Sequence, residues 1–545
     1  MLRFRKEGIA LELALSSTRL FGDFLNHFDK LSSFLVGDFR DSESYEKVSE
    51  TIDSREYPRD QLSDILTRQN SLYGLSREVE VNISRLREAE SLMVITGQQV
   101  GLLGGTVLSL YKAIGAIKLA GELSEKLSRP VIPAFWMATD DHDYSEVNQL
   151  QVLNSANQIS KYIYAFSPEM MGRPISEVKV DASIEGLFVS LEKALSDSEF
   201  KRALLGKLRT FYAERRPLLE GFARLFADLF GKYGLILINP AERGFKRLAS
   251  PLFRREIEEF PKPLEAIEET DRLLESCGYH LQVQKSKPGP NLFLSRDKRE
   301  PIRAGEAQFV LGESGLEVSS QELLGELKES PERFSPNVLL RPVMQGFLFP
   351  TVAYVAGPSE VAYCVQVKSL IHYHEVPCPV VSPRPSATVI ESKIGKVLDK
   401  YQVDFLDFFR DREGVINRIY SEDFPPELEA SADEFHREVL RPFEEYRGKF
   451  RHLGESFTKN LERVQSRFDY EMKNLKAKTF QAYKKMNQDA KDQLERAHLF
   501  LFPTGRLQER VLSPVYFLNK YGPEFIEALH EALEANSSEH RLIYF

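Results

Sequence analysis

The chain has 545 residues, too many for a single hydrophobic core, so we expect several structural modules. A net charge of −9 argues against general nucleic-acid binding, which needs a basic face. Three cysteines are too few for a disulfide framework, and no apolar run approaches the roughly 20 residues of a membrane span. These features predict a soluble, cytoplasmic protein that binds neither nucleic acid nor a membrane.

The first half of the chain predicts the start of a parallel sheet. Residues 1–90 show helical spacing broken by Pro58 and Gly74, and we expect these helices to pack on the sheet. A buried strand at Leu92–Ile95 opens into a glycine-rich loop, and Thr106 can cap the helix that follows. A second buried strand at Ile132–Ala138 completes a strand–helix–strand unit.

Two inserted modules are predicted next. Alternating residues around a turn at Asn154–Asn157 predict a hairpin within 149–166, followed by helices through 230. A buried strand at Gly234–Asn239, with a helix from about Phe245, can join the same sheet. Residues 255–335 then read as an α+β insertion whose strands are expected at His280–Gln284, Asn291–Ser295 and Ala307–Leu311.

The sheet is predicted to resume after the insertions. We expect strands at Val338–Arg341 and Thr351–Ala356, a helix through Val367, a strand at Val380–Ser382 and a loop over 383–388. Two half-sheets split by insertions indicate one α/β core of the Rossmann-like, nucleotide-binding type. Ligands of such sheets bind beyond the carboxyl ends of the strands, so the site is expected there.

A long helical arm follows the core. Between Ser431 and Ala497, apolar residues recur by threes and fours from Leu453 to Met486, which is typical of a coiled-coil seam. An antiparallel partner within 395–450, dimerisation, or both would cover this stripe.

The predicted organisation is 1–150, N-terminal helices and first half of the core; 151–230, first insertion; 231–255, core strand and helix; 256–335, second insertion; 336–394, second half of the core; 395–500, arm; and 501–545, a tail on the core.

The loop after the first strand is a candidate binding element. Backbone amides of glycine-rich turns approach anions closely, and helix amino ends favour them. Neither the dinucleotide fingerprint nor the P-loop pattern is present. Two side-chain amides support a binding role, and the alternative is a tight strand–helix connection. The candidates are Gly97, Gln98, Gln99, Gly101, Gly104 and Thr106.

The second candidate is the acidic tetrad Asp140-Asp141-His142-Asp143, which follows the second strand. A histidine flanked by carboxylates can serve as an acid, a base or a donor to phosphate. The carboxylates could also gather Mg²⁺ with ATP. The alternative is a solvated loop in which one aspartate caps the next helix.

Two further strand ends carry candidate side chains. Gly357, Pro358 and Glu360 open a helix toward the ligand edge, where Tyr354 and Tyr363 could stack on a base or sugar or simply belong to the core. In the loop 383–388, Arg384, Ser386 and Thr388 could hold a phosphate, with a capping loop before a helix from Val389 as the alternative.

Cys364, His372, His374 and Cys378 lack the spacing of a structural zinc site, so no structural metal is expected.

Several runs together resemble the bacillithiol biosynthesis cysteine-adding enzymes. They span nearly the whole chain in order: Ile95–Gly101, Tyr111–Ile114 with Lys112, Phe135–Asp143, Leu340–Gln345, Thr351–Pro358, Pro383–Arg384 and Leu501–Arg510. The resemblance implies ligation of cysteine to glucosaminyl-malate. Because amide formation from a free carboxylate in water is uphill, we expect ATP as cosubstrate. The resemblance also implies a core similar to class I aminoacyl-tRNA synthetases, with two connecting insertions and a coiled-coil arm that forms a homodimer.

For an amide-forming enzyme of this kind, we expect the following roles for the candidate residues. His142 would handle protons or phosphate, Asp141 and Asp143 would orient it or bind the substrate amine, and Arg384 would stabilise the leaving group. The HIGH and KMSKS signatures of the synthetases are absent, so the route of cysteine activation stays open. The alternatives are another nucleotide-dependent transferase on the same fold and a non-catalytic coiled-coil assembly protein.

Overall fold

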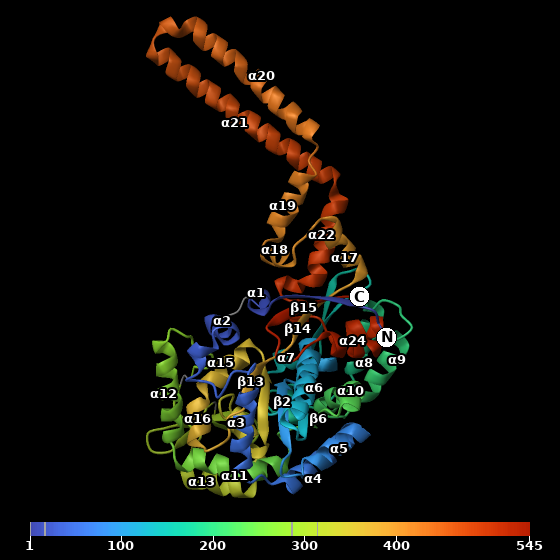
Figure 1. The fold of residues 1–545 in the computed structure, drawn as a ribbon, viewed down its shortest axis with the longest axis vertical. Helices are drawn as coiled ribbons and strands as arrows, with labels where there is room; N and C mark the ends of the chain where they lie inside the picture. The colour runs from blue at the N-terminus through green and yellow to red at the C-terminus, as the bar shows by residue number, and fades with distance from the viewer. Residues whose placement is uncertain (1, 16–17, 285–286, 313) are drawn as a thin grey trace. The chain divides into compact units, whose positions relative to one another are not determined.

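A computed structural model describes residues 2–545 except 16–17, 285–286 and 313. The chain divides into two compact units, a larger one that combines the chain up to Ile390 with Arg506–Phe545, and a second one at Glu391–Gly505. Figure 1 shows the elements of both. Within the described ranges, no helix combines the length and apolarity needed to cross a membrane.

The larger unit is built on a five-stranded parallel sheet in the order β13-β12-β2-β3-β6. Its strands are β2 (Leu92–Gln98), β3 (Val131–Met137), β6 (Ile236–Ile238), β12 (Thr351–Ala356) and β13 (Val380–Pro383). They are buried almost throughout, as parallel strands covered on both faces must be. The strand order reverses between β2 and β12, so the predicted two-halved α/β core is confirmed.

Helices from distant parts of the chain cover this sheet. The N-terminal helices lie on it as predicted, with α3 against β12 and α4 against β6. The central crossover helix is α6 (Leu108–Leu127), which packs on β2, β3 and β12. The other helices around this sheet are α2 (Arg19–Asn26), α3 (Ser42–Asp53), α4 (Arg59–Tyr73), α5 (Arg77–Arg85), α11 (Arg243–Glu258), α14 (Leu340–Leu348), α15 (Pro358–Gln366) and α16 (Lys368–Tyr373). Helix α1 (Leu11–Leu15) packs instead on the strands at Arg5–Ala10 and Glu539–Tyr544.

The two ends of the chain meet in a small second sheet. Strand β15 (Glu539–Tyr544) pairs antiparallel with β1 (Arg5–Ala10) and parallel with β14 (Ser386–Ile390). The predicted loop over 383–388 is therefore wrong in its second half, and the next helix, α17, begins at Ser392 rather than at Val389. The partner that makes β14 a strand lies about 150 residues away, so no local pattern could reveal it.

The first insertion follows the prediction. Strands β4 (Gln149–Leu153) and β5 (Ile159–Ile163) form the expected hairpin. It is preceded by α7 (Tyr144–Val147) and followed by the helices α8 (Ile184–Ala194), α9 (Lys201–Phe211) and α10 (Leu218–Phe230). The tail helices α23 (Pro514–Tyr521) and α24 (Glu524–Ala532) contact α9 and α6 respectively.

The second insertion is an antiparallel sheet in the order β10-β9-β8-β7-β11. It comprises β7 (Leu292–Ser295), β8 (Arg299–Ala304), β9 (Phe309–Leu311), β10 (Glu317–Val318) and β11 (Phe334–Pro336), with α12 (Lys262–Ser276) and α13 (Ser320–Glu329). The strands predicted at 291–295 and 307–311 are confirmed, but 280–284 contains no strand and β8 was missed.

The strand predicted at Val338–Arg341 is wrong, because helix α14 starts at Leu340. A short apolar run fits a buried helix as well as a buried strand, and periodicity alone cannot separate the two.

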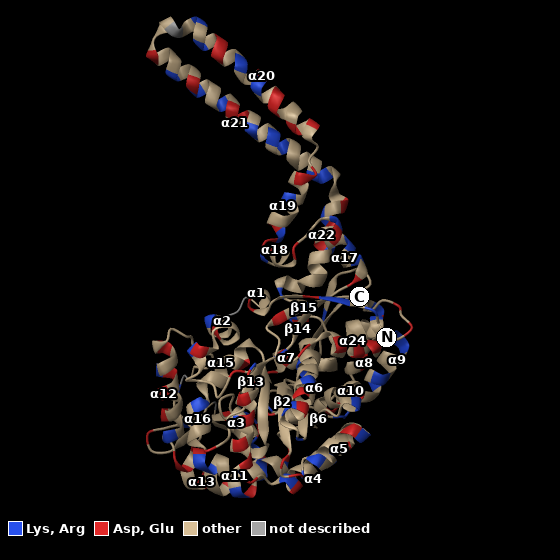
Figure 2. Cartoon of the chain, viewed as in Figure 1, with Lys and Arg blue, Asp and Glu red and all other residues tan. Residues whose placement is uncertain are grey.

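The second unit contains the predicted arm. Helices α20 (Pro426–Phe450) and α21 (Glu455–Met486) form an antiparallel hairpin in which Phe443 meets Phe468 with ring centroids 5.2 Å apart. The antiparallel partner expected from the seam is therefore present in the same chain. Acidic and basic side chains are interspersed along both helices (Figure 2). The other helices of this unit are α17 (Ser392–Lys400), α18 (Phe405–Arg410), α19 (Arg412–Glu422) and α22 (Gln488–Leu501).

Candidate active site

A cavity of about 680 Å³ opens at the carboxyl ends of β2, β3 and β12, where the strand order reverses. It brings together most of the residues predicted from sequence, including the segments near 140 and 384. The predicted residues that line it are Gly97, Gln98, Gln99, Lys112, Asp140, Asp141, His142, Tyr354, Gly357, Pro358, Glu360, Tyr363 and Arg384. The predicted residues that do not line it are Gly101, Gly104, Thr106, Asp143, Ser386 and Thr388.

The glycine loop makes a tight strand–helix connection, and its residues Gly97, Gln98 and Gln99 line the cavity. A Cβ on Gly101 would lie 2.6 Å from the Cα of Gly105, so the two backbone segments touch. Thr106 is not the cap of α6, because Val107 holds that position and makes no side-chain capping bond. The Val107 amide donates instead to Leu512 O at 2.9 Å, so the start of α6 is closed by the C-terminal segment.

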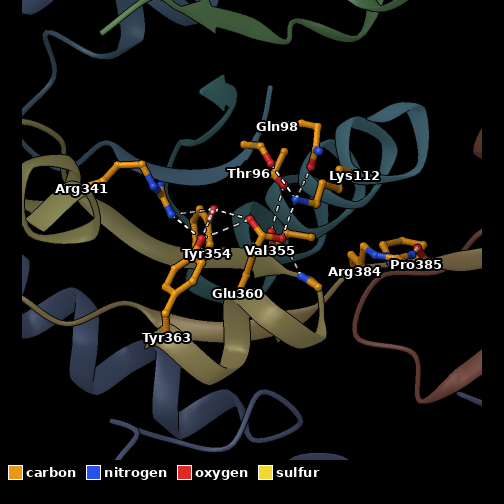
Figure 3. A network of polar contacts seen from close by, with 12 residues as sticks. Thr96, Gln98, Lys112, Arg341, Tyr354, Val355, Glu360, Tyr363, Arg384 and Pro385 are labelled. Atoms are coloured by element: carbon orange, nitrogen blue, oxygen red, sulfur yellow. Dashed lines mark hydrogen bonds and ion pairs between the residues drawn. The ribbon is translucent and has the colours of Figure 1, made fainter. Parts of the chain in front are cut away.

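A connected polar network forms one wall of the cavity (Figure 3). Lys112 Nζ lies 2.5 Å from Glu360 Oε2 and donates to the carbonyl oxygen of Gly97 at 2.7 Å. The hydroxyl of Tyr354 donates to Glu360 Oε1 at 2.8 Å, and that of Tyr363 does so at 3.3 Å. Lys112 and Glu360 come from different halves of the core, so this network ties the two halves together.

Arg341 completes the network with a second cation. Its Nη2 donates to the hydroxyls of Tyr354 at 3.2 Å and Tyr363 at 2.5 Å. Burial raises the pKa of both tyrosines well above the ordinary value, so both remain protonated donors. Two cations facing the single carboxylate of Glu360 leave this wall with excess positive charge, which suits an anionic ligand group.

Burial sets the protonation of the ion pair. It lowers the pKa of Lys112, while the nearby Glu360 carboxylate opposes that change. Burial also works to raise the pKa of Glu360, but Lys112, the backbone amide of Gly357 and Arg341 together hold that pKa below its ordinary value. Each partner thus favours the ionised form of the other against the effect of burial.

A second buried ion pair supports the acidic tetrad. Lys246 on α11 is fully buried, and its Nζ lies 2.6 Å from Asp140 Oδ2. Burial lowers the pKa of Lys246, and Asp140 opposes that shift. Asp140 is thus held in place by a buried cation that does not itself line the cavity.

Asp141 and His142 lie in a separate cluster. Asp141 accepts hydrogen bonds from Gln99 Nε2 and from the backbone amide of His142, both at 2.7 Å. His142 Nδ1 lies 3.1 Å from Nη1 of Arg299, a residue of the inserted antiparallel sheet. The insertion therefore supplies part of the cavity wall.

The last tetrad member plays a different part from the one predicted. Asp143 caps α7 by accepting from the backbone amide of Ser145 at 3.0 Å and from its hydroxyl at 2.6 Å. It therefore neither orients His142 nor converges with Asp140 and Asp141 on a cation. Among the residues that the structure describes, no group of three or more His, Cys, Asp or Glu side chains could hold a metal.

The segment 384–388 is anchored by the C-terminal part of the chain. Arg384 Nη2 donates to Glu509 Oε1 at 2.6 Å, and Ser386 Oγ donates to Glu509 Oε2 at 2.8 Å. Thr388 Oγ1 lies 2.9 Å from His540 Nε2. Both hydroxyls are therefore engaged in the core, whereas Arg384 and the neighbouring Arg510 line the cavity.

Several lining or supporting residues were missed from sequence. Arg341 and Arg510 fall inside runs that carried the family resemblance, so those runs were the available signal. Lys246, Arg299 and Glu146 have no such local signal. Glu146 lines the cavity on α7, and partial burial together with the charges of Asp143 and Asp141 raises its pKa.

Comparison with known proteins agrees with this architecture. Residues 6–385 match the family described as "Bacillithiol biosynthesis BshC, N-terminal Rossmann-like domain". Residues 387–545 match "Bacillithiol biosynthesis BshC, C-terminal coiled-coil domain". A solved structure described as a "putative arginyl t-RNA synthetase" from Campylobacter jejuni matches with a TM-score of 0.22 and 10% identity over 81% of this chain and 91% of that chain, too weak a likeness to support an inference.

Curated relatives match over nearly their whole length. A protein of Salinibacter ruber named "Putative cysteine ligase BshC" is 34% identical over 529 residues, which cover 96% of each chain. A protein of Koribacter versatilis with the same name is 33% identical over 528 residues, 97% of each chain. The chain therefore belongs to the BshC family of bacillithiol biosynthesis.

Proposed function

We propose that this protein is a ligase that joins the carboxyl group of cysteine to the amine of glucosaminyl-malate, with ATP as the source of activation. The relatives' name supports the use of cysteine, and the family's pathway supports bacillithiol as the product. The observation that carries the proposal is the 680 Å³ cavity at the strand-order reversal, lined by charged side chains from both halves of the core.

The charges of the cavity fit these substrates. The described lining residues include five cationic side chains and four carboxylates, although the whole chain carries a net charge of −9. The cations are Lys112, Arg299, Arg341, Arg384 and Arg510; the carboxylates are Asp140, Asp141, Glu146 and Glu360. The cationic side chains can bind malate carboxylates and nucleotide phosphates, and the carboxylates can bind the ammonium group of cysteine or of the aminosugar.

Activation of the cysteine carboxylate is required because amide formation from a free carboxylate in water is uphill. ATP would convert that carboxylate into an acyl phosphate or an acyl adenylate, and the aminosugar nitrogen would then displace the phosphate or AMP. Arg341 and Arg384 lie where they can stabilise negative charge on the departing group. Glu146, with its raised pKa, can take the proton released by the attacking amine.

We also propose that the arm forms a homodimer. Neither α20 nor α21, both described in full, contains a buried residue. The hairpin alone therefore leaves the apolar stripe of the coiled-coil seam exposed to solvent. Val464, Phe468 and Leu475 are 45%, 44% and 45% exposed. The same stripe on a second copy would cover it without a new partner.

The ligase assignment is tested by incubating the purified protein with cysteine, glucosaminyl-malate and ATP and measuring bacillithiol by mass spectrometry. The substitution His142→Ala should lower kcat by about 10²–10³-fold, the usual cost of losing one hydrogen-bond donor to developing negative charge. His280→Gln, at an exposed histidine outside the cavity, is the matched control and should leave the rate unchanged.

A binding measurement separates loss of chemistry from loss of substrate. Trp136 is the only tryptophan of the sequence and lines the cavity, so bound ligands should alter its fluorescence. Absence of bacillithiol with all three substrates, together with no fluorescence change on adding glucosaminyl-malate or ATP, would overturn the proposal.

A further inference from the structure

The position of Arg299 fixes how His142 can act. The Nη1 atom of Arg299 lies 3.1 Å from Nδ1 of His142, within hydrogen-bonding distance. A guanidinium group has only donors and keeps its charge in proteins. Nδ1 of His142 must therefore accept this bond, so the proton of the neutral imidazole is carried by Nε2.

Arg299 is itself rigidly held. Its Nε donates to Ser335 Oγ at 3.0 Å, and its Nη2 donates to the carbonyl oxygen of Pro336 at 3.2 Å. The guanidinium carbon lies 3.7 Å from the centre of the Phe293 ring, over its face. The side chain is only 7% exposed. Three contacts thus aim the remaining Nη1 at His142 and leave little freedom to turn away.

Asp141 makes the arrangement sensitive to the loss of Arg299. Its Oδ1 lies 3.7 Å from both Nη1 of Arg299 and Nδ1 of His142. Without the arginine, this carboxylate would be the nearest acceptor for a proton on Nδ1. The ring would then favour the opposite tautomer and present a lone pair, instead of an N–H, at Nε2.

We propose that Arg299 is a positioning residue that holds His142 as a hydrogen-bond donor through Nε2–H, for an anionic oxygen of the bound substrate. In the proposed ligase, on which this use of the donor rests, that oxygen is a carboxylate or a phosphoryl oxygen of the activated cysteine. His142 then stabilises negative charge, and the amine proton goes to a carboxylate. The inserted antiparallel sheet thereby sets the chemistry of a residue on the parallel core.

The tautomer is measured directly by ¹⁵N NMR of histidine-labelled full-length protein at neutral pH. The His142 signals are assigned by their loss in His142→Gln. The wild type should show an unprotonated, hydrogen-bonded Nδ1 and a protonated Nε2. In Arg299→Ala the Nδ1–H form should become populated, and in the double variant Arg299→Ala/Asp141→Asn it should decline again because the acceptor carboxylate is gone.

Two matched variants show whether the change in the His142 tautomer comes from loss of the donor or from a general disturbance of the structure. Arg299→Lys keeps one donor near Nδ1 and should restore part of the wild-type spectrum. Arg303→Ala removes an arginine of the same strand that donates to the carbonyl oxygen of Gly312 at 3.2 Å and does not line the cavity, so it should leave the His142 signals unchanged. Circular dichroism and thermal melts confirm that each variant is folded.

The kinetic consequence is a split between kcat and KM. Arg299→Ala should lower kcat of bacillithiol formation by on the order of 10²-fold, with a smaller change in KM, because the donor is needed where charge develops. A protonated Nδ1 in the wild type, or an unchanged tautomer in folded Arg299→Ala, would overturn the inference. If the expected tautomers appear but no bacillithiol forms, the ligase proposal fails while the role of Arg299 stands.

Discussion

At the scale of single residues, the site depends on charges that stabilise one another inside the protein. Lys112 is 3% exposed, and Lys246 and Glu509 are fully buried, yet each lies against an oppositely charged partner. A buried charge without its partner is strongly destabilising, whereas a neutral isosteric pair is often tolerated. The cavity wall is therefore sensitive to single substitutions and tolerant of matched ones.

The pair formed by Lys112 and Glu360 gives the clearest test. Lys112→Met should lower the free energy of unfolding by about 3 kcal/mol, because Glu360 is left buried without its cation. The double variant Lys112→Met/Glu360→Gln should recover part of that loss. Urea unfolding of both single variants and the double variant completes the cycle. Equal and additive losses would contradict the coupling.

Buried histidine should make the fold sensitive to acid. Burial lowers the pKa of His540 from its ordinary value of 6.5 to about 4, with Glu509 opposing and Arg384 reinforcing the shift. The unfolded chain binds the proton more readily, so stability is complete above about pH 6.5 and declines as the pH falls toward 4. At about 1.4 kcal/mol per pH unit, the loss is roughly 3 kcal/mol.

The measurement is the thermal unfolding midpoint between pH 4 and 7. His540→Gln should flatten its decline, since a neutral amide can keep a hydrogen bond to Ser386 or Thr388 without titrating. His280→Gln, at an exposed position, should follow the wild-type curve. A His540→Gln curve parallel to that of the wild type would show that other groups govern the acid response.

At the scale of elements, close backbone contacts shape the loop between β2 and α6. Gly104 adopts a φ of +94°, and a Cβ there would lie 3.0 Å from Leu225 Cδ2. This loop is packed under the helices α10 and α23, so its glycines fix the approach of β2 to the cavity. The glycine content of this loop identified it as unusual. The sequence could not show which of its residues pack against other helices and which line the cavity.

Two glycine substitutions on this segment should act in opposite directions. Gly101→Ala should destabilise the larger unit by about 1–3 kcal/mol, because its Cβ would meet the backbone of Gly105. Gly121→Ala, in the exposed middle of α6 with nothing within 4 Å of the new Cβ, should stabilise it by about 0.5–1 kcal/mol. Thermal unfolding of both proteins checks this, and a neutral Gly101→Ala would refute the tight contact.

At the scale of the whole molecule, chain ends and insertions complete a site that the parallel sheet alone would leave open. Strand β15 makes β14 a strand, Glu509 holds Arg384, and Arg299 reaches the cavity from the inserted sheet. The arm is a separate unit whose apolar stripe is only half covered by its own hairpin.

The proposed homodimer predicts a change of mass with one substitution. The wild type should sediment at about twice the 62.5 kDa of the chain. Phe468→Glu would place a charge in the exposed stripe and should shift the protein toward the monomer. Lys478→Glu, at an exposed polar position of the same helix, should stay dimeric. A monomeric wild type at micromolar concentration would exclude the homodimer.

The sequence alone determined the features that depend on local pattern. Continuous apolar runs identified all five core strands, alternation identified the hairpin of β4 and β5, and the spacing of threes and fours identified the arm. Runs that resemble those of one family indicated the family, and strand ends indicated many of the residues that line the cavity. These features can be predicted because each kind of burial gives apolar residues a characteristic spacing along the sequence. A strand buried on both faces is continuously apolar, a strand buried on one face alternates, and a helix stripe recurs every three or four residues.

Only the tertiary structure decided which charges pair and which loop residues line the cavity. Asp140 with Lys246, and His142 with Arg299, are separated by 106 and 157 positions, and their pairing depends on how distant elements pack. The same holds for the helix at Leu340, the strand at Ser386 and the turned-away Asp143. Pairing and orientation are set by long-range contacts, on which the local order of residues places no constraint.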